Sequence, residues 1–323
     1  MQTAFSVFLS FGVYSFLGWV CETFYCSVGQ RHFVNRGFLF GPVCPVYGFG
    51  ALAVLYLLAP FTRQPILLFI AAMVVTSLLE YLTGFLLEKL FHTKWWDYST
   101  YRFNLHGRVC LKNSLLFGLI ALIMVLFINP AVQRGLSQLS PPVSAAFSLL
   151  LAAAFMADTV QSVRSALALS RKAEQLFALR AELREKSAAY REALQQFISL
   201  QAADSEELRA AIREKLDALP RFEGSEELRA AIREKLDALP RKKHSEPVSE
   251  ALHARLEELR AHTEALYAGF SQLYQRRERL TDSANSHRRL LTAFPGMRSL
   301  RHEGILEELR LSLKERKNQR NAE

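Results

Sequence analysis

The chain has 323 residues, of which 50% are hydrophobic, and its net charge is +9 with a pI of about 9.5. Its mean hydropathy of +0.07 averages two unlike halves, because residues 1–168 are apolar and aromatic whereas residues 169–323 are rich in Arg, Glu, Lys and Ala. The basic residues lie in loops beside apolar runs or are mixed with Glu on helices. This placement argues against binding to nucleic acid and for contact with the lipid bilayer.

Five apolar runs predict five membrane-spanning helices. The runs cover residues 4–28, 38–60, 65–91, 110–129 and 142–165. Each has about 20 residues or slightly more, which is enough to cross a hydrocarbon core of about 30 Å at about 1.5 Å per residue. The first run has no basic stretch before it, and Glu22 interrupts the region where a cleavage site would fall. We therefore expect a membrane span there rather than a cleaved signal peptide.

Basic residues alternate between the loops and predict an orientation in the cell membrane. The odd-numbered exits from the spans carry Arg31, His32 and Arg36, then Lys89, Lys94, Arg102, Arg108 and Lys112, then Arg164, Arg171 and Lys172. The second and fourth loops carry only Arg63 and Arg134. Because cytoplasmic loops hold the excess of Lys and Arg, the N-terminus is expected outside and the C-terminal half in the cytoplasm. The predicted fold class is an all-α, polytopic membrane helix bundle over residues 1–168, followed by a cytoplasmic helical and coiled-coil region.

The second predicted span is rich in residues that break helices. Its first half contains Gly37, Gly41, Pro42, Pro45 and Gly48. Since proline removes a backbone donor and clashes one turn back, this density predicts a kinked, partly unwound or re-entrant segment. Broken helices expose backbone dipoles that bind ions or substrates, whereas the alternative is close helix packing through the Gly37–Gly41 spacing.

Polar and ionisable residues of the membrane half form the candidate substrate site. They are Glu22, Asn35, Arg36, Glu80, Glu88, Asp97, Asn104, Arg108 and Asp158. Ionisable groups within spans are costly and usually face the bundle interior, so we interpret the set as a polar site at the cytoplasmic side. Two alternatives stay open. One is an ion-pair network that only fixes helix packing, and in the other some of these acids lie at headgroup level.

One polar stretch, Trp95 to Arg108, joins the third and fourth spans. Its aromatic residues, Trp95, Trp96, Tyr98 and Tyr101, are typical of an interfacial belt. The histidines and Asp97 nearby match no ligand spacing, so no metal site is predicted. The four cysteines, Cys21, Cys26, Cys44 and Cys110, include no CxxC pair and are interpreted as buried free thiols.

Several blocks resemble a known family. FLGWVCE at 16–22, NRGFLFGPVCPVYGFG at 35–50, LLEYLTGFLLEKLF at 78–91, WWDYS at 95–99 and FNLHGRVCLKNSLLFG at 103–118 resemble the signature blocks of a bacterial multi-spanning family labelled putative ABC-transporter type IV permease. The segment LLTAFPGMRSLRHEGILEEL at 290–309 is similar to the C-terminal block of that family. The resemblance implies a transport permease and transfers no catalytic residue. The helical region between these blocks departs from the family.

The second half predicts a coiled-coil arm over residues 169–297 and an amphipathic helix with a basic tail over 298–323. Within the arm, apolar residues recur at spacings of three and four over 171–202 and again over 246–291. An antiparallel hairpin of these helices is the simplest packing, and a parallel homodimer is the alternative. The sequence SEELRAAIREKLDALP occurs unchanged at 205–220 and 225–240, which predicts two short amphipathic helices.

No nucleophile elbow, Walker loop, HExxH or paired CxxC motif is present, so we expect neither an enzyme nor a cofactor. The sequence predicts a transport-associated, permease-like component without an ATPase of its own. Its expected partners are the bilayer, a separate ATPase or other protein, and a second copy through the coiled coil. The alternative function is a membrane-anchored scaffold or sensor that recruits a partner through its arm.

Overall fold

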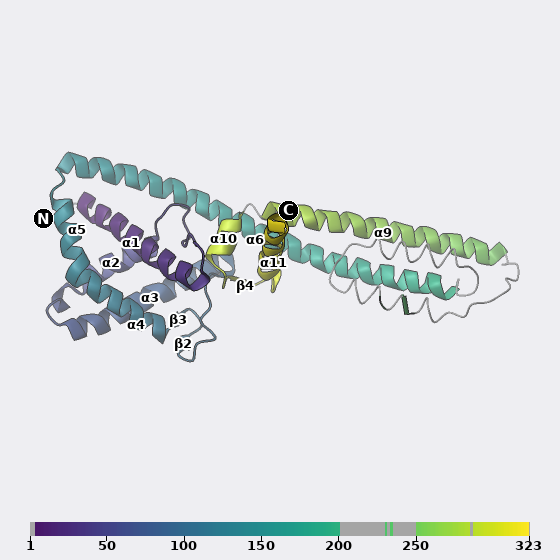
Figure 1. Cartoon of the computed structure of the whole chain (residues 1–323), viewed down its shortest axis with the longest axis horizontal. Coiled ribbons are helices and arrows are strands. Elements are labelled where there is room, and N and C mark those ends of the chain that lie inside the picture. The colour runs from purple at the N-terminus through teal and green to yellow at the C-terminus, as the bar shows by residue number, and fades with distance from the viewer. Residues whose placement is uncertain (1–3, 201–229, 231–232, 235–249, 285–286, 323) are drawn as a thin grey trace. The chain divides into compact units, whose positions relative to one another are not determined.

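The computed structural model describes residues 4–200, 230, 233–234, 250–284 and 287–322 (Figure 1). Helices make up nearly all of the described elements, so the predicted all-α fold is confirmed. The chain divides into two compact units. One contains residues 1–174 together with 284–323, and the other contains residues 175–283.

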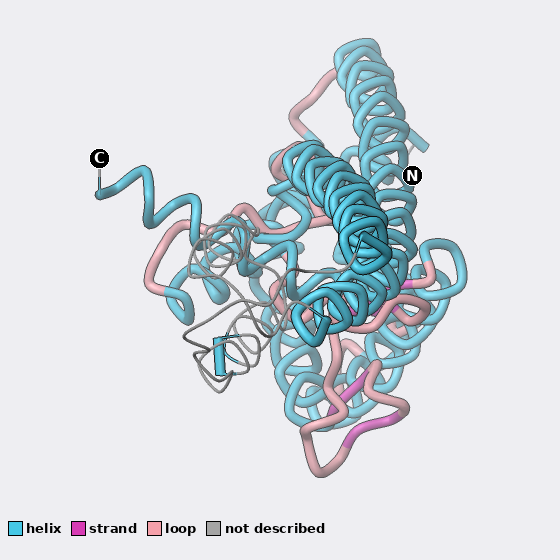
Figure 2. The backbone as a smooth tube through the Cα atoms, turned by 90° about the vertical axis from the view of Figure 1, so that its right-hand side faces the viewer, coloured by secondary structure: helices cyan, strands magenta, loops and turns pink. Residues whose placement is uncertain are grey.

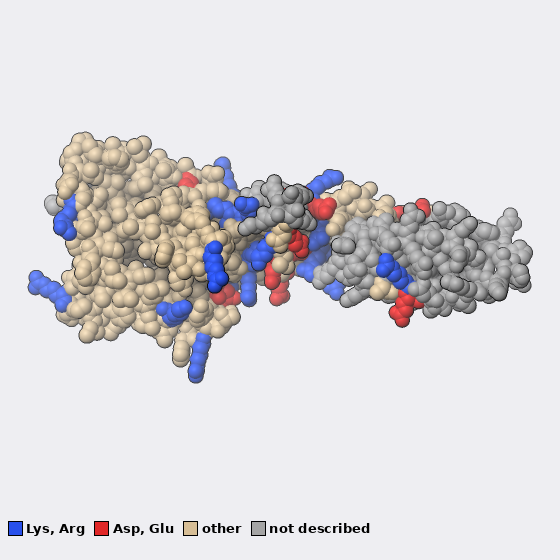
Figure 3. Space-filling model, viewed as in Figure 1, with Lys and Arg blue, Asp and Glu red and all other residues tan. Residues whose placement is uncertain are grey.

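The first unit contains the apolar helices. They are α1 (Ala4–Gln30), α2 (Pro45–Leu57), the 3-10 turn η1 (Ala59–Phe61), α3 (Pro65–Phe91), α4 (Leu111–Ile123), the π segment η2 (Met124–Ile128), α5 (Asn129–Ser137) and the first part of α6 (Pro141–Leu200). Among the described residues, four helical runs are long and apolar enough to cross a membrane: α1, α3, the run from α4 to α5, and α6. The face in Figure 3 carries few charged side chains over this bundle, as lipid contact requires.

The second predicted span differs from a simple helix. Its helix, α2, has 13 residues, about 20 Å at about 1.5 Å per residue, which is too short to cross the hydrocarbon core alone. Residues 31–44 contain no helix, and α2 begins at Pro45, where a missing N–H costs nothing. The amide of Cys44 donates to the carbonyl of Ser15 in the middle of α1, at 2.9 Å. The residues before α2 are thus the unwound part of this span, as their Gly and Pro content predicts.

The fourth span changes its helical geometry in the middle. Pro130 has no N–H to donate one turn back, and its ring would clash with the carbonyl of Leu126. The turn before it, Met124–Ile128, is a π-helix, which widens the backbone around the misfit. The next side chain, Asn129, accepts a hydrogen bond of 2.7 Å from the Tyr14 hydroxyl of α1, so the widened turn is held by a polar contact.

A small hairpin follows α3. Strand β2 (Asn104–Leu105) pairs antiparallel with β3 (Val109–Cys110), and the hairpin projects beyond the helix ends (Figure 2). Its turn places His106 and Gly107 at φ of 53° and 69°, which is the pattern of a tight type I′ turn. A Cβ at Gly107 would lie 2.7 Å from Asp97 Oδ1, so this position requires glycine.

The C-terminal residues pack in the first unit. Strand β4 (Arg298–Ser299) pairs antiparallel with β1 (Thr93–Lys94), and helices α10 (Arg288–Ala293) and α11 (Ile305–Ala322) flank it. Residues 284–297 therefore belong to this unit, although the sequence placed them in the arm. The last helix begins at Ile305 and continues to Ala322, so the basic segment expected as a tail is mostly helical.

The second unit is an antiparallel pair of helices. Helix α6 continues to Leu200, as the absence of Pro and Gly predicts, and pairs with α9 (Glu250–Ala284). Phe270 is 1% exposed and packs with Leu179 and Leu183, while the rings of Tyr190 and Tyr267 lie 6.0 Å apart. The duplicated segments at 205–220 and 225–240 fall almost wholly outside the described residues.

Candidate functional site

A polar cluster lies inside the first unit, where α1, the start of α2, α3 and the loop after α3 meet. We use this name for Glu22, Arg36, Cys44, Tyr47, Glu80 and Tyr98. The Glu22 carboxylate accepts a hydrogen bond of 3.0 Å from Nε of Arg36. Glu80 accepts a hydrogen bond from the Tyr98 hydroxyl and interacts electrostatically with Glu22. The sequence named Glu22, Arg36 and Glu80 for this site, and the structure brings these three together.

The loop residue Tyr98 closes the cluster from outside the spans. Burial raises the pKa of the Tyr98 hydroxyl, and the negative charge of Glu80 raises it further. The phenol therefore stays protonated and acts as a donor. Glu80 still has one buried oxygen, Oε2, with no hydrogen-bond partner among the described residues. The cluster thus retains an unused acceptor inside a helix bundle, which is costly in that setting.

Arg36 joins the cluster to the C-terminal residues. Its Nη1 donates to the carbonyl of Ala293, and its guanidinium lies 4.5 Å from the centre of the Phe294 ring. The neighbouring Asn35 accepts a hydrogen bond of 2.8 Å from Nε1 of Trp19. Asn35 thus anchors the loop to α1 and directs the next residue toward Glu22.

The unwound segment, residues 37–41, has its backbone groups bound by two charged side chains. Asp158 of α6 accepts hydrogen bonds from the amides of Phe40 and Gly41, both at 2.7 Å. Arg289 of α10 donates to the carbonyls of Gly37, Phe38 and Leu39 at 3.0, 2.6 and 2.7 Å. The sequence named Asp158 for the substrate site. Its hydrogen bonds go to the backbone of the unwound segment, and its nearby cation is Arg289.

Sequence reasoning missed Arg289. It lies directly before the C-terminal block at 290–309 and beside a second arginine. These two positions in the sequence were the only signals that could have identified it. Gly37 also has a specific role, because its φ of 133° is unfavourable for other residues and a Cβ there would lie 3.1 Å from Cys44 Sγ.

Glu88 and Arg108 form a separate pair. Nε of Arg108 donates to Glu88 at 3.0 Å, and Nη1 donates to the Tyr81 hydroxyl at 3.1 Å. The guanidinium also lies 5.1 Å from the centre of the Tyr81 ring and 5.5 Å from that of Phe85. Arg108 therefore ties the hairpin to α3, and its partner is Glu88 rather than Glu22 or Glu80.

Asp97 and Asn104 organise the hairpin. Asp97 accepts from the amide of Ser99 at 3.0 Å and lies 3.8 Å from Lys94 and 3.5 Å from Arg298. Burial raises the pKa of Asp97, but the hydrogen bonds from Ser99 and the two cations outweigh it and lower the pKa. Asn104 accepts from the Gly107 amide at 2.9 Å. These two side chains build the turn that carries Tyr98 and Arg108.

Two interpretations of the aromatic and sulfur residues need correction. Trp95 is 4% exposed, so it is a core residue and not part of an interfacial belt, although Tyr101 is 43% exposed. The described cysteines are all free thiols, but only Cys44 and Cys110 are buried, whereas Cys21 is exposed.

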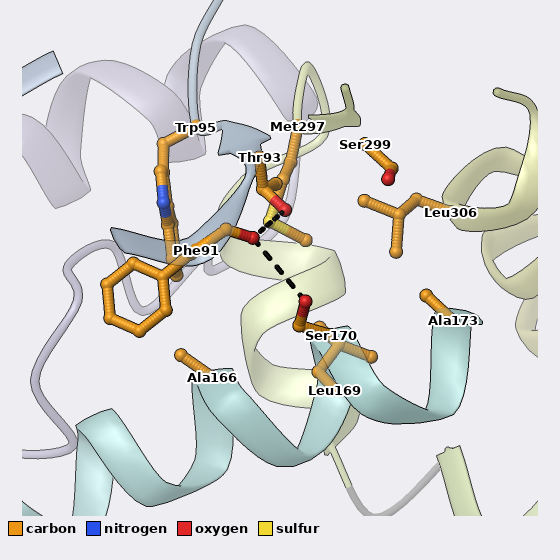
Figure 4. Close-up of a pocket in the computed structure, with 10 residues that line it drawn as sticks. All are labelled: Phe91, Thr93, Trp95, Ala166, Leu169, Ser170, Ala173, Met297, Ser299 and Leu306. Carbon is orange, nitrogen blue, oxygen red and sulfur yellow. Dashed lines mark hydrogen bonds between the residues drawn. The ribbon is translucent and has the colours of Figure 1, made fainter. Parts of the chain in front are cut away.

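A small cavity lies between α6 and the C-terminal residues (Figure 4). It is lined by Phe91, Thr93, Trp95, Ala166, Leu169, Ser170, Ala173, Met297, Ser299 and Leu306. Its volume of about 20 Å³ holds roughly one water molecule. The hydroxyls of Thr93 and Ser170, two polar groups of its wall, both donate to the carbonyl of Phe91. This cavity is too small for a solute.

His287 fixes the start of α10 against α6. Its Nδ1 lies 2.9 Å from the Ser165 hydroxyl, and its Nε2 lies 3.1 Å from Nζ of Lys172. Burial lowers the pKa of His287, and the charge of Lys172 lowers it further. The ring is therefore neutral at pH 7 and accepts from the ammonium group.

Acidification is expected to weaken this contact. The pKa of His287 in the folded protein lies below its unfolded value of 6.5. The contribution of the neutral His287 ring to the free energy of unfolding is therefore complete above pH 6.5 and is lost as the pH falls. On lowering the pH from about 7.5 to about 5.5, the melting temperature of the wild type should fall by about 2 °C more than that of His287→Gln. Thermal unfolding in one detergent checks this. Parallel melting curves for the two proteins would contradict it.

Metal binding finds no support in the described residues, since no group of three or more His, Cys, Asp or Glu side chains is placed to hold an ion. The arrangement instead offers two carboxylates, one guanidinium and two phenols between helices. Such a set can bind a polar solute or carry a proton without forming a covalent bond.

The comparisons with known proteins agree with this architecture. Residues 9–163 match the model of a family described as putative ABC-transporter type IV. No curated protein and no solved structure matches the chain. The matched residues include the unwound segment, the hairpin and every cluster residue named above, and they end within α6. Residues 9–163, in the membrane half of the chain, therefore match the family described as putative ABC-transporter type IV, the family that the sequence blocks resemble.

Proposed function

We propose that this protein is a transport-associated, permease-like membrane component, and that its polar cluster contacts the transported solute. The observation that carries the proposal is Glu80, an ionisable residue in a membrane-type helix with one buried oxygen left without a hydrogen-bond partner among the described residues. Intramembrane carboxylates are rare and costly, and they usually mark the path of a solute or a proton.

The orientation belongs to the same proposal. In this proposal the polar cluster lies near the cytoplasmic side, the N-terminus lies outside and the arm lies in the cytoplasm, and the excess of basic residues in the first and third loops supports that orientation. Because the sequence contains no Walker motif, the proposal assigns ATP binding to a separate partner chain and assigns no enzymatic activity to this one.

Substitution of Glu80 by Gln tests the cluster. Cells that lack the chain are complemented with the wild type or with Glu80→Gln, and they are then given a defined mixture of isotope-labelled solutes. Mass spectrometry of cells and medium identifies solutes whose movement depends on the chain. We expect Glu80→Gln to slow that movement at least about tenfold. A tenfold slower rate corresponds to a rise of about 1.4 kcal/mol in the activation free energy.

The matched control is Glu303→Gln, which makes the same change at an exposed glutamate outside the cluster. Membrane levels of both variants are measured, so that reduced insertion is not mistaken for reduced transport. Equal transport by Glu80→Gln and the wild type, at equal membrane levels, would refute the assignment of the solute site.

A scaffold or sensor is the second candidate, and the antiparallel pair of α6 and α9 favours it. A helical hairpin with a buried Phe270 offers a long surface to a partner. Purification of the full chain from native membranes separates the candidates. A co-purifying ATPase supports transport. A co-purifying soluble enzyme or cell-envelope protein, together with normal behaviour of Glu80→Gln, supports the scaffold.

A further inference from the structure

The unwound segment needs a partner for every backbone group that a helix would satisfy internally. In an apolar environment each unpaired amide or carbonyl is costly, because it has lost its hydrogen bonds to water and gained none in return. Asp158 binds two amides and Arg289 binds three carbonyls of residues 37–41. Two side chains from distant parts of the chain thus replace about one turn of helix.

Arg289 suits this task because of its shape. A guanidinium has five N–H donors in a planar fork, so one side chain can reach three successive carbonyls, whereas a lysine ammonium is a compact point. The same group lies 4.2 Å from the centre of the Phe40 ring, so it packs on the segment as well as binding it. Arg289 therefore defines the path of residues 37–39.

The short helix that carries Arg289 is itself held at both ends. His287 contacts Ser165 and Lys172 of α6 at its start. At its end, the carbonyl of Ala293 accepts from Arg36, and the ring of Phe294 packs at 4.9 Å on Trp95. We call residues 287–294 the latch. It connects α6, the unwound segment and the polar cluster.

We propose that the latch gates the polar cluster, with Arg289 as the positioning residue that keeps the unwound segment closed over it. Release of Arg289 frees three carbonyls and the Phe40 ring, and the segment beside Cys44 then opens. The consequence for a solute rests on the proposed function, whereas the test below does not measure transport.

Cys44 is a native reporter of this opening. It lies three residues after the segment and is 4% exposed, and its Sγ lies 3.9 Å from the carbonyl oxygen of Arg36. Full-length protein in native membranes is treated with N-ethylmaleimide, and the labelled fraction of each cysteine is followed by peptide mass spectrometry. Cys110, which is 1% exposed in β3, serves as an internal control for general unfolding.

Arg289→Ala is expected to raise the labelling rate of Cys44 at least about tenfold, because the segment beside Cys44 then opens more often. The labelling rate of Cys110 should stay unchanged, because the rest of the fold stays closed. Arg289→Lys keeps the positive charge but not the planar guanidinium. Its labelling rate at Cys44 should lie between those of the wild type and Arg289→Ala. Arg288→Ala removes the neighbouring exposed arginine and should leave both rates at wild-type values.

Unchanged labelling of Cys44 in Arg289→Ala would overturn the proposal, and so would an equal rise at Cys110, because Arg289 would then only hold the fold. If the variants do not accumulate, hydrogen exchange of the wild type decides. The peptides covering 36–44 and 287–294 should exchange slowly and at a shared rate. Exchange of 36–44 as fast as that of the exposed turn at 99–103 would reject the latch.

Discussion

Replacement of Arg36 by alanine is expected to destabilise the first unit by about 2–4 kcal/mol, because it leaves the Glu22 carboxylate unpaired inside the helix bundle. The side chains of Arg36 and Glu22 are only 14% and 24% exposed, so water replaces the lost cation poorly. The substitution also removes the donor to Ala293 and the contact with Phe294. A drop in melting temperature of about 4 °C or more follows for a unit of this size.

A double-mutant cycle separates the charge from the packing. Glu22→Gln removes the carboxylate that Arg36→Ala would strand, so the double variant should be more stable than the sum of the single effects by about 1–3 kcal/mol. Arg63→Ala, at an exposed arginine, is the control and should change stability by less than about 0.5 kcal/mol. Strict additivity of Arg36→Ala and Glu22→Gln would show that the pair does not stabilise the bundle as an ion pair.

Substitution of Trp95 by alanine is expected to cost about 3–5 kcal/mol, the range for removing a large aromatic side chain from a core. The Trp95 ring makes edge contacts with Phe38 at 5.2 Å, Phe91 at 5.7 Å and Phe294 at 4.9 Å. These rings belong to the unwound segment, the end of α3 and the latch. Loss of Trp95 therefore loosens three parts of the unit at once.

Two further variants give this experiment its contrast. The indole nitrogen of Trp95 has no hydrogen-bond partner among the described residues, so Trp95→Phe loses only packing and should cost about half as much or less. Tyr101→Ala removes an exposed aromatic from the same stretch and should have little effect. Thermal unfolding in one detergent measures all three. If Trp95→Ala lowers the melting temperature no more than Tyr101→Ala does, Trp95 is an interfacial residue and not a core residue.

The long elements followed from local patterns. Residues 143–202 contain neither Pro nor Gly, and α6 accordingly continues through the membrane-type segment into the arm. The Gly and Pro residues of 37–48 predicted a broken span, and α2 begins only at Pro45. Both features depend on backbone geometry, which neighbouring residues determine. The same patterns did not reveal how short α2 is, since Gly and Pro predict a break without determining where the helix resumes.

The candidate site was recovered only in part. Ionisable residues in apolar runs are recognisable because burial of charge is costly, and this identified Glu22, Glu80 and Asp158. Their partners were less accessible to sequence reasoning. Arg108 was named for one site with these acids but pairs with Glu88, and Asn104 and Asp97 hold a turn. A salt bridge depends on which helix faces meet, and composition does not encode this.

The stretch from Trp95 to Arg108 shows the same division. By itself, the sequence determined that a polar, aromatic loop separates two apolar helices, because hydropathy is a property of each segment alone. Only the tertiary structure decided that Trp95 is buried, that Tyr98 reaches Glu80, and that the latch some 190 residues later packs on both the loop and the unwound segment. Such contacts arise when the chain closes on itself and unsatisfied backbone groups acquire partners, and no local pattern specifies which distant side chain supplies them.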